Sequence, residues 1–143
     1  ISSVQAEYSL INNSIEGLFL DTCIEKGINV FSYGPLAQGL LTGKYDLNSV
    51  FDDDDCRKRL THFHGANFNK YKKILNKIFD ISNKYQITMS QVALRWVLEN
   101  PNISCAISGV KSIAQIKDNT HALEFTIHPD DYEFFSRTPK GAL

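Results

Sequence analysis

The sequence predicts an α/β domain built on a parallel sheet, and two observations lead to this class. Three short apolar segments, residues 4–10, 28–33 and 103–108, are typical of buried strands, and helical patterns lie between them. Strands that alternate with helices pair in parallel, because each helix returns the chain to the same end of the sheet. The order strand, helix, strand, long loop, two helices, strand and two helices fits either an open sheet or part of a closed barrel.

The overall composition fits one globular domain and excludes several kinds of partner. The 143 residues are 43% hydrophobic and carry a formal net charge of −1, which is ordinary for a domain with its own core. A charge so close to zero argues against nucleic acid, since phosphate binding needs a basic face. No apolar run approaches the ~20 residues of a membrane span, and no signal peptide is recognisable, so we expect a cytoplasmic protein.

The cysteines predict reduced thiols and no metal site. Cys23, Cys56 and Cys105 are scattered and form no C-x-x-C pair, which is typical of a reducing compartment. Cys56 lies near His62 and His64 in the sequence, but their spacing matches no zinc pattern. We therefore interpret Cys56, His62 and His64 as parts of a loop.

The beginning of the chain has the pattern of a βαβ unit. Residues 4–10 alternate polar and apolar side chains, as a strand does, and a turn-rich segment separates them from a helix over residues 15–26. Gly27 suits the position after the helix end, and residues 28–33 form the next strand. Short joints of this kind predict two parallel strands. We expect the buried face of the helix to hold Leu18, Phe19, Thr22 and Cys23.

A long segment without regular periodicity follows, from residue 34 to residue 68. Gly34 and Pro35 end the strand, and glycine interrupts the apolar run after them too often for a helix. An acidic run at residues 52–55 is interpreted as solvated loop. Loops of this length are functional or disordered in most compact domains. Because residues 52–68 have no apolar periodicity to anchor them, we expect them to be mobile without a ligand.

Helical periodicity returns after this loop and continues through two helices. Thr88 and Gln91 predict a capping box at the start of the second helix, and Asn100-Pro101 ends it. The apolar face of the first helix comprises Tyr71, Ile74, Leu75, Ile78, Ile81 and Tyr85. The apolar face of the second helix comprises Val92, Ala93, Trp96 and Val97.

The last part of the chain predicts a third strand and two further helices. The strand at residues 103–108 is stopped by Gly109. Ser112 and Gln115 predict a second capping box, which opens a helix. Pro129 suits the first position of a short final helix.

Three long stretches resemble one known family. They are QAEYSLI from Gln5, GINVFSYGPLAQGLLTGKYD from Gly27, and ITMSQVALRWVLENPNISCAISGVKSIAQIKDNTHAL from Ile87. Together they resemble the aldo-keto reductases, in particular the branch that contains bacterial reductases and potassium-channel β subunits. The resemblance implies that residues 1–143 are one partial domain, the C-terminal portion of a (β/α)8 TIM barrel with strands 6–8 and their helices. Strands 1–5 would precede Ile1.

The resemblance implies that the loop at residues 34–68 is a belt over NADP. In the family, an aromatic residue at the place of Tyr33 stacks on the nicotinamide ring, and a glutamine at the place of Gln5 pairs with the carboxamide. Small residues let backbone N–H groups approach a phosphate. From the residues alone, a core-packing tyrosine and an outward-facing glutamine stay open as alternatives. The residues matched to the pyrophosphate-binding part are Gly34, Pro35, Leu36, Ala37, Gln38 and Lys44.

The segment after the third strand is similar to the family's adenosine-phosphate site. A helix N-terminus offers free N–H groups and partial positive charge to a phosphate. By the resemblance, Gly109 and Gln115 face the phosphorylated ribose, whereas Asp118 and Asn119 hold the adenine. Lys111 stands where the family often has a serine. It serves as a point charge for the 2′-phosphate or else points into solvent.

No residue of this chain matches the family's catalytic aspartate, tyrosine, lysine and histidine, which we expect upstream of Ile1. An arginine that this branch carries after its belt corresponds to Arg57 or Arg59. The resemblance implies an NADPH-dependent oxidoreductase that reduces small aldehydes or ketones to alcohols, with this chain as the cofactor-binding part and inactive alone. The alternative is a truncated or non-catalytic member that acts as a nucleotide-binding or protein-binding regulatory module.

A three-stranded excerpt of a barrel predicts self-association. It leaves two strand edges unpaired, and such edges pair readily with another chain. The isolated chain is therefore expected to associate or to fold poorly. We also expect the barrel interior to be lined by Val4, Ile28, Val30, Ala106 and Ile107.

Overall fold

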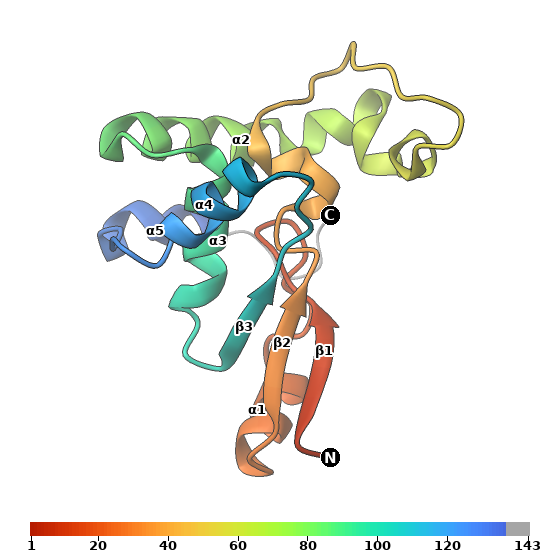
Figure 1. The fold of residues 1–143 in the computed structure, drawn as a ribbon. Helices are drawn as coiled ribbons and strands as arrows, with labels where there is room; N and C mark the ends of the chain where they lie inside the picture. Colours follow the sequence, from red (N-terminus) through yellow and green to blue (C-terminus); the bar gives the residue numbers. More distant parts are fainter. Residues whose placement is uncertain (137–143) are drawn as a thin grey trace.

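A computed structural model describes residues 1–136 as a small parallel sheet with helices around one side and one end (Figure 1). The strands are β1 (Ser3–Glu7), β2 (Asn29–Tyr33) and β3 (Ile103–Ile107). The α-helices are α1 (Leu18–Glu25), α2 (Gly65–Tyr85), α3 (Met89–Glu99), α4 (Ile113–His121) and α5 (Pro129–Ser136). Short 3-10 helices lie between β2 and α2, namely η1 (Ala37–Thr42), η2 (Cys56–Arg59) and η3 (Thr61–Phe63).

The sheet has the predicted order and direction. Its strands follow one another as β1-β2-β3, and both pairings are parallel. The pairing of β2 with β3 shifts register after Val30, so that Ser104 is an extra residue in β3. Its hydroxyl donates a hydrogen bond to Asn29 Oδ1 at 3.1 Å. The prediction of three adjacent parallel strands is therefore confirmed.

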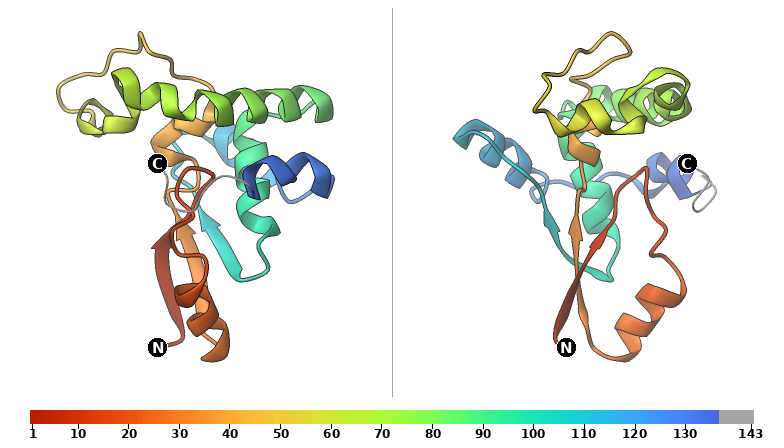
Figure 2. Two further views of the ribbon diagram at one scale, coloured as in Figure 1. Left: turned by 180° about the vertical axis from the view of Figure 1, so that it is seen from behind. Right: turned by 90° about the vertical axis from the view of Figure 1, so that its right-hand side faces the viewer.

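The two faces of the sheet differ in what covers them. In Figure 1 the strands lie in front of α1, and the view from behind in Figure 2 shows α1 in front of the strands. The covered face packs Val30 and Ile103 into a cluster with Leu20 of α1 and Val97 of α3. Side chains alternate along each strand, so the open face carries every second residue. The residues of the open face include Gln5, Glu7, Phe31, Tyr33, Cys105 and Ile107.

The prediction for the barrel interior is thus largely wrong. Val4, Val30 and Ala106 lie on the helix-covered face, and Ile28 packs against the same cluster. Of the predicted set, Ile107 alone lies on the open face. The alternation of side chains along each strand separates the residues of the two sheet faces. It does not show which of the two faces the helices cover.

The first strand and the first helix are shorter than predicted. β1 ends at Glu7, because Ser9 turns back to form an antiparallel bridge with Asn12. Helix α1 begins only after Gly17, whose φ of 95° leaves the helical region. The helix buries Leu20 and Cys23. The predicted burial of Leu18, Phe19 and Thr22 is wrong, since all three are exposed.

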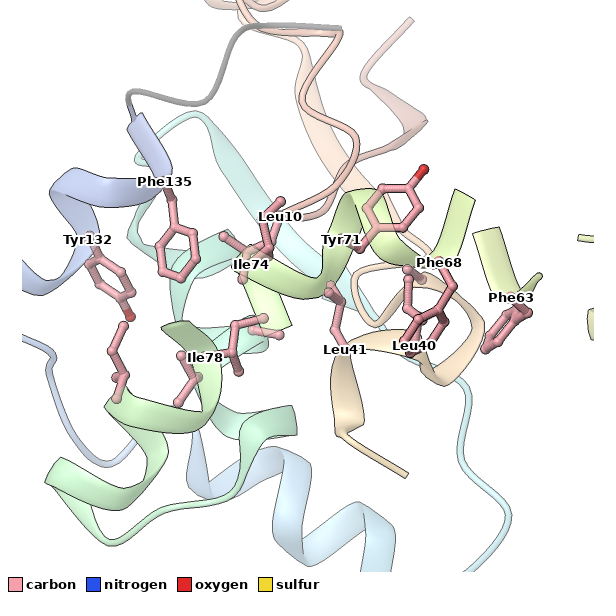
Figure 3. Close-up of a cluster of buried hydrophobic side chains, with 14 of the residues drawn as sticks. Leu10, Leu40, Leu41, Phe63, Phe68, Tyr71, Ile74, Ile78, Tyr132 and Phe135 are labelled. Atoms are coloured by element: carbon pink, nitrogen blue, oxygen red, sulfur yellow. The ribbon is translucent and has the colours of Figure 1, made fainter. Parts of the chain in front are cut away.

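The main hydrophobic cluster lies outside the sheet, between α2 and the loop that precedes it (Figure 3). Leu40 and Leu41 of η1 are fully buried against α2, whose predicted face supplies Ile74 and Ile78. Phe51, Phe63 and Phe68 are buried in the same cluster. The prediction that residues 52–68 lack an apolar anchor is therefore wrong, and their mobility without a ligand stays a prediction.

The predicted caps were correct at α3 and partly correct at α4. Thr88 Oγ1 accepts from Gln91 N, and Gln91 Oε1 accepts from Thr88 N, which completes a capping box. At α4, Ser112 Oγ accepts from Gln115 N at 3.2 Å. The Gln115 side chain accepts instead from Lys111 N at 2.6 Å, so the reciprocal bond of the box is replaced.

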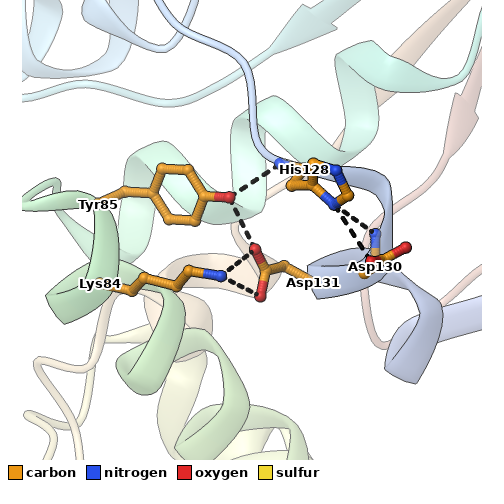
Figure 4. A network of polar contacts seen from close by, with 5 residues as sticks. All are labelled: Lys84, Tyr85, His128, Asp130 and Asp131. Carbon is orange, nitrogen blue, oxygen red and sulfur yellow. Dashed lines mark hydrogen bonds and ion pairs between the residues drawn. The ribbon is translucent and has the colours of Figure 1, made fainter.

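The C-terminal helix α5 begins at Pro129 as predicted, and it docks against the end of α2. The Asp131 carboxylate accepts from Lys84 Nζ at 2.8 and 3.0 Å and from the Tyr85 hydroxyl at 2.7 Å (Figure 4). The Tyr85 hydroxyl also accepts from His128 N at 2.9 Å. These contacts lower the pKa of Asp131, with the Lys84 hydrogen bond as the largest cause. Among the described helices, none is both long and apolar enough to cross a membrane.

Candidate functional site

A groove of about 1030 Å³ opens at the carboxyl ends of β2 and β3. Its walls come from the loop after β2, the acidic run, the start of α3, and the segment from β3 into α4. Binding loops gather at this end of a parallel sheet. Most of the predicted cofactor residues line it, namely Gly34, Pro35, Leu36, Gln38, Lys44, Gly109, Lys111, Gln115, Asp118 and Asn119.

The wall after β2 is a compact turn held in an unusual backbone conformation. Ala37 N donates to Gly34 O at 2.9 Å, and both Ala37 and Gln38 have positive φ values, 47° and 53°. Consecutive non-glycine residues in this region are uncommon and cluster at functional sites. Ala37 is buried below the groove and does not line it. The turn is thereby fixed by the packing beneath it.

A close approach to α3 fixes the far end of this turn. A Cβ atom added to Gly43 would lie 2.3 Å from the Met89 sulfur, and Gly43 has a φ of 74°. Only glycine fits this position without a shift of Met89. Lys44 follows directly and lines the groove.

Gln5 and Tyr33 lie beside the groove and not in its wall. Both are on the open face of the sheet, and Tyr33 is 45% exposed at the end of β2. In register with Tyr33 is Glu7, whose carboxylate accepts from Asn12 Nδ2 at 3.0 Å. Sequence reasoning treated Glu7 only as a polar strand residue. The strand alternation that places Gln5 on one face also places Glu7 there.

The turn before α4 is organised by side chains that were predicted to bind a ligand. The Gln115 side chain holds Lys111 N, and Asn119 Nδ2 donates to Ser108 Oγ at 3.0 Å. Lys111 lines the groove, and none of the ion pairs among the described residues includes it. Ser108 also lines the groove, although sequence reasoning assigned it no role. Its position at the end of the predicted third strand, where binding loops gather, could have indicated that Ser108 lines the groove.

Asp118 has a structural partner in α3. Its Oδ1 accepts from Gln91 Nε2 at 2.8 Å, and its Oδ2 accepts from Thr88 Oγ1 at 3.1 Å. Gln91 also donates to the Asp118 carbonyl at 2.9 Å. Both carboxylate oxygens therefore tie α4 to the capped start of α3. Helical spacing placed Asp118 on the predicted face, but it did not reveal this neighbour.

On the opposite wall, Arg57 lines the groove and Arg59 does not. Arg57 Nε donates to Asp55 Oδ1 at 2.8 Å, and its terminal nitrogens contact Asp55 Oδ2 and the Tyr45 hydroxyl. The guanidinium carbon lies 4.8 Å from the centre of the Tyr45 ring. The geometry thus favours Arg57 over Arg59 as the groove arginine. Sequence reasoning assigned no role to Asp55 or Tyr45. The spacing of Asp55 and Arg57, two residues apart, was the one signal for their contact.

The histidines of the same loop are outside the groove. Burial lowers the pKa of His62, the nearby Glu7 opposes this shift, and His64 adds to it. The His62 Nε2 atom is buried without a hydrogen-bond partner. Cys56 is exposed and lines the groove. In residues 1–136, no three His, Cys, Asp or Glu side chains are placed to share a metal ion.

Comparison with curated proteins identifies relatives along nearly the whole chain. Residues 1–137 match the family described as Aldo/keto reductase family. The chain is 31% identical over 134 residues to an aldo-keto reductase of Strobilurus tenacellus and 32% identical over 142 residues to a probable aldo-keto reductase of Glycine max. These matches cover 92% and 99% of this chain, but only 40% and 41% of the relatives.

Solved structures confirm the fold class. A glycerol dehydrogenase from Gluconobacter oxydans superposes with a TM-score of 0.84 at 23% identity, covering 99% of this chain and 45% of that one. An aldo-keto reductase from Klebsiella pneumoniae in complex with NADPH gives 0.69 at 22% identity, covering 99% and 41%. These likenesses show that the parallel strands form part of a (β/α)8 barrel. With the family match over residues 1–137, they lead to one conclusion: the chain belongs to the aldo/keto reductase family.

Proposed function

We propose that this chain supplies the NADP-binding part of an NADPH-dependent aldo-keto reductase that reduces aldehydes or ketones to alcohols. The observation that carries the proposal is the groove, in which two distant segments, the loop after β2 and the start of α4, face one volume. Its volume of about 1030 Å³ lies at the upper end of the ~300–1,000 Å³ that is typical of ligand pockets, which suits a large ligand such as a dinucleotide. The Klebsiella pneumoniae relative solved with NADPH supports the choice of cofactor.

Three basic residues of the groove offer contacts to an elongated anion. They are Lys44, Arg57 and Lys111, and the carboxylates of Asp52, Asp54, Asp55 and Asp118 line the same groove. The start of α4 adds backbone N–H groups with partial positive charge. Gly34-Pro35 presents little bulk, which leaves room for a pyrophosphate. Beside this groove, Tyr33 offers an exposed ring for the nicotinamide and Gln5 an amide for its carboxamide.

The chemistry that bound NADPH supplies is hydride transfer to the carbonyl carbon. This chain's residues bind and orient the cofactor, and the proton for the carbonyl oxygen comes from a residue outside them. General acid catalysis contributes typically ~10²–10⁴-fold to a rate. The 143-residue chain assayed alone with a reactive aldehyde is therefore expected to show no NADPH oxidation.

The test compares two cofactors in the full natural chain that contains these residues. Lys111→Ala combined with Gln115→Ala is expected to weaken NADPH binding by about 1–3 kcal/mol, because a charge-assisted contact to the 2′-phosphate is lost. NADH binding should change much less, since NADH lacks that phosphate. Isothermal titration calorimetry measures both.

Lys117→Ala provides the control, since Lys117 is an exposed lysine of α4 that does not line the groove. It should leave both affinities unchanged. An equal loss of NADPH and NADH in the double variant would place the 2′-phosphate elsewhere. Absence of any NADPH binding by the unmodified chain would reject the proposed function.

A further inference from the structure

The guanidinium of Arg57 is already bonded to another side chain of the same loop. Its Nε donates to both oxygens of Asp55, at 2.8 and 3.1 Å, and a terminal nitrogen also contacts Oδ2. Asp55 Oδ1 accepts in addition from Arg57 N at 2.9 Å. Both side chains are about four-fifths buried, with exposed fractions of 20% and 21%. This is a bidentate pair, the geometry by which arginine also recognises phosphate.

Arg57 also joins the two ends of the segment from Tyr45 to Arg57, called here the acidic loop because it contains the acidic run at residues 52–55. Its guanidinium carbon lies 4.8 Å from the centre of the Tyr45 ring and 5.2 Å from that of Phe51. The rings of Tyr45 and Phe51 are 5.3 Å apart, and both contact the Phe63 ring. Arg57 thus closes the segment between Tyr45 and itself, and Asp55 holds Arg57 in that position.

The groove wall around this pair is acidic. Asp52, Asp54 and Asp55 line the same volume as Lys44 and Arg57. An entering phosphate therefore meets a cation whose charge Asp55 has already neutralised. Phosphate oxygens form the same bidentate bonds to a guanidinium as a carboxylate does, so a phosphate of a bound dinucleotide can replace Asp55 as the partner of Arg57.

We propose that Asp55 is a built-in competitor for the anionic ligand of the groove: it occupies Arg57 in the empty protein, and a phosphate of the bound dinucleotide displaces it. Displacement frees Arg57 from Asp55 and loosens the closure of the acidic loop. The affinity for the ligand is lowered by the free energy of breaking the Asp55–Arg57 pair. This inference rests on the proposed function, because it assumes a phosphorylated ligand in the groove.

The test is Asp55→Asn in the full natural chain, with NADPH as the probe and calorimetry as the measurement. The variant should bind NADPH about tenfold more tightly, since the ion pair of Arg57 with a carboxylate is exchanged for a weaker hydrogen bond to a neutral amide. Asp54→Asn is the matched control, because Asp54 has the same charge, lines the same groove and is not bonded to Arg57. It should change the affinity by less than about threefold.

A double-variant cycle separates the specific competition from a general effect of charge. In an Arg57→Ala background, Asp55→Asn should tighten NADPH binding no more than Asp54→Asn does. If Asp54→Asn tightens binding as much as Asp55→Asn, or if the tenfold gain of Asp55→Asn persists without Arg57, the effect comes from the summed charge of the groove and the proposal is overturned. Unchanged or weaker NADPH binding by Asp55→Asn, with the unmodified chain binding normally, would also overturn it. Failure of the unmodified chain to bind NADPH rejects the proposed function instead.

A measurement on the unmodified chain does not depend on the folding of any variant. The Arg57 Nε–H resonance reports its hydrogen-bond partner. Titration with NADPH should move this resonance as the carboxylate is replaced by phosphate. A resonance that stays at its position when the groove is saturated would contradict the exchange.

Discussion

The sheet and the helical cluster around α2 bury their apolar side chains in different ways. In the cluster, Leu40, Leu41 and Ile78 are fully buried by residues of this chain. In the sheet, one face packs on α1 and α3, whereas Tyr33 and Ile107 on the other face remain 45% and 41% exposed. The cluster therefore completes its own core, and the sheet does not.

This difference shows which part of the groove depends on neighbours beyond the described residues. The cluster anchors the segment from Gly34 to Phe63 through residues such as Leu41 and Phe51, so this part of the groove wall is supported within the described chain. Gln5 and Tyr33 belong to the open face, which in a closed barrel packs against the remaining strands. We expect variants in the two regions to differ in their effect on stability.

The largest expected effect is in the cluster. Ile78→Ala should lower the free energy of unfolding by about 2–5 kcal/mol, because it removes apolar contacts and leaves a cavity at a fully buried site. Phe79→Ala is the control on the same helix, since Phe79 is 54% exposed. Urea unfolding followed by circular dichroism measures both. Equal losses for the two variants would mean that α2 is not the centre of a closed core.

The next largest effect is expected where α3 meets α4. Gln91→Ala should cost about 1–3 kcal/mol, because it removes the reciprocal bond of the capping box and leaves Asp118 Oδ1 without its donor. Thr120→Ala on the exposed side of α4 should cost much less. The same unfolding measurement applies. A Gln91→Ala variant as stable as the unmodified chain would show that the two helices are held by other contacts.

A smaller effect, which depends on pH, is expected at the contact of α5 with α2. Lys84 and Tyr85 lower the pKa of Asp131, so the folded state favours its charged form. The resulting stability is fully present above the unfolded pKa of about 3.9 and is lost as the pH falls through the lower folded value. Asp131→Asn should be less stable than the unmodified chain at pH 7, and this gap should narrow below pH ~4. A gap that is constant with pH would contradict the ion pair.

The smallest effect on stability is expected on the open face of the sheet. Ile107→Lys should change the free energy of unfolding by no more than about 0.5 kcal/mol, because the side chain is already partly exposed. The same change should reduce self-association of the 143-residue chain, which we expect through the open face and the free edges of β1 and β3. Analytical ultracentrifugation measures this. A monomer at all concentrations would refute the association.

Strong apolar patterns allowed much of the fold to be predicted. The parallel direction of the strands followed from strand–helix alternation, and their order followed from the barrel that the resemblance implied. The buried face of α2 followed from residues spaced three and four apart, such as Ile74 and Ile78. The anchors of the long loop could not be found in this way. Phe51 and Phe63 are single apolar residues in a polar segment, and no periodicity marks where an isolated side chain will pack.

The resemblance named segments that the fold brings together, but it did not give their contacts. The loop after β2 and the start of α4 line one groove, and their binding of a cofactor stays a prediction. The resemblance did not reveal that Asp118 is bonded to Gln91, or that Asp55 is bonded to Arg57. Such pairs depend on which elements meet in space. Sequence spacing shows which residues share one face of a helix, but it does not show which other element packs against that face.

The anchors of the long loop also have a consequence for the evolution of its length. Leu41, Phe51 and Phe63 fix the chain at separate points, so the loop closes as several short spans and not as one long one. Lengthening a single flexible span is inexpensive, about 0.6 kcal/mol for each doubling. We therefore expect insertions and deletions among family members to accumulate within the acidic run at 52–55, whereas the spacing from Gly34 to Leu41 should stay constant. The acidic run, whose length is expected to vary, thereby lies in the same groove as the turn from Gly34 to Leu41, whose shape is expected to stay constant.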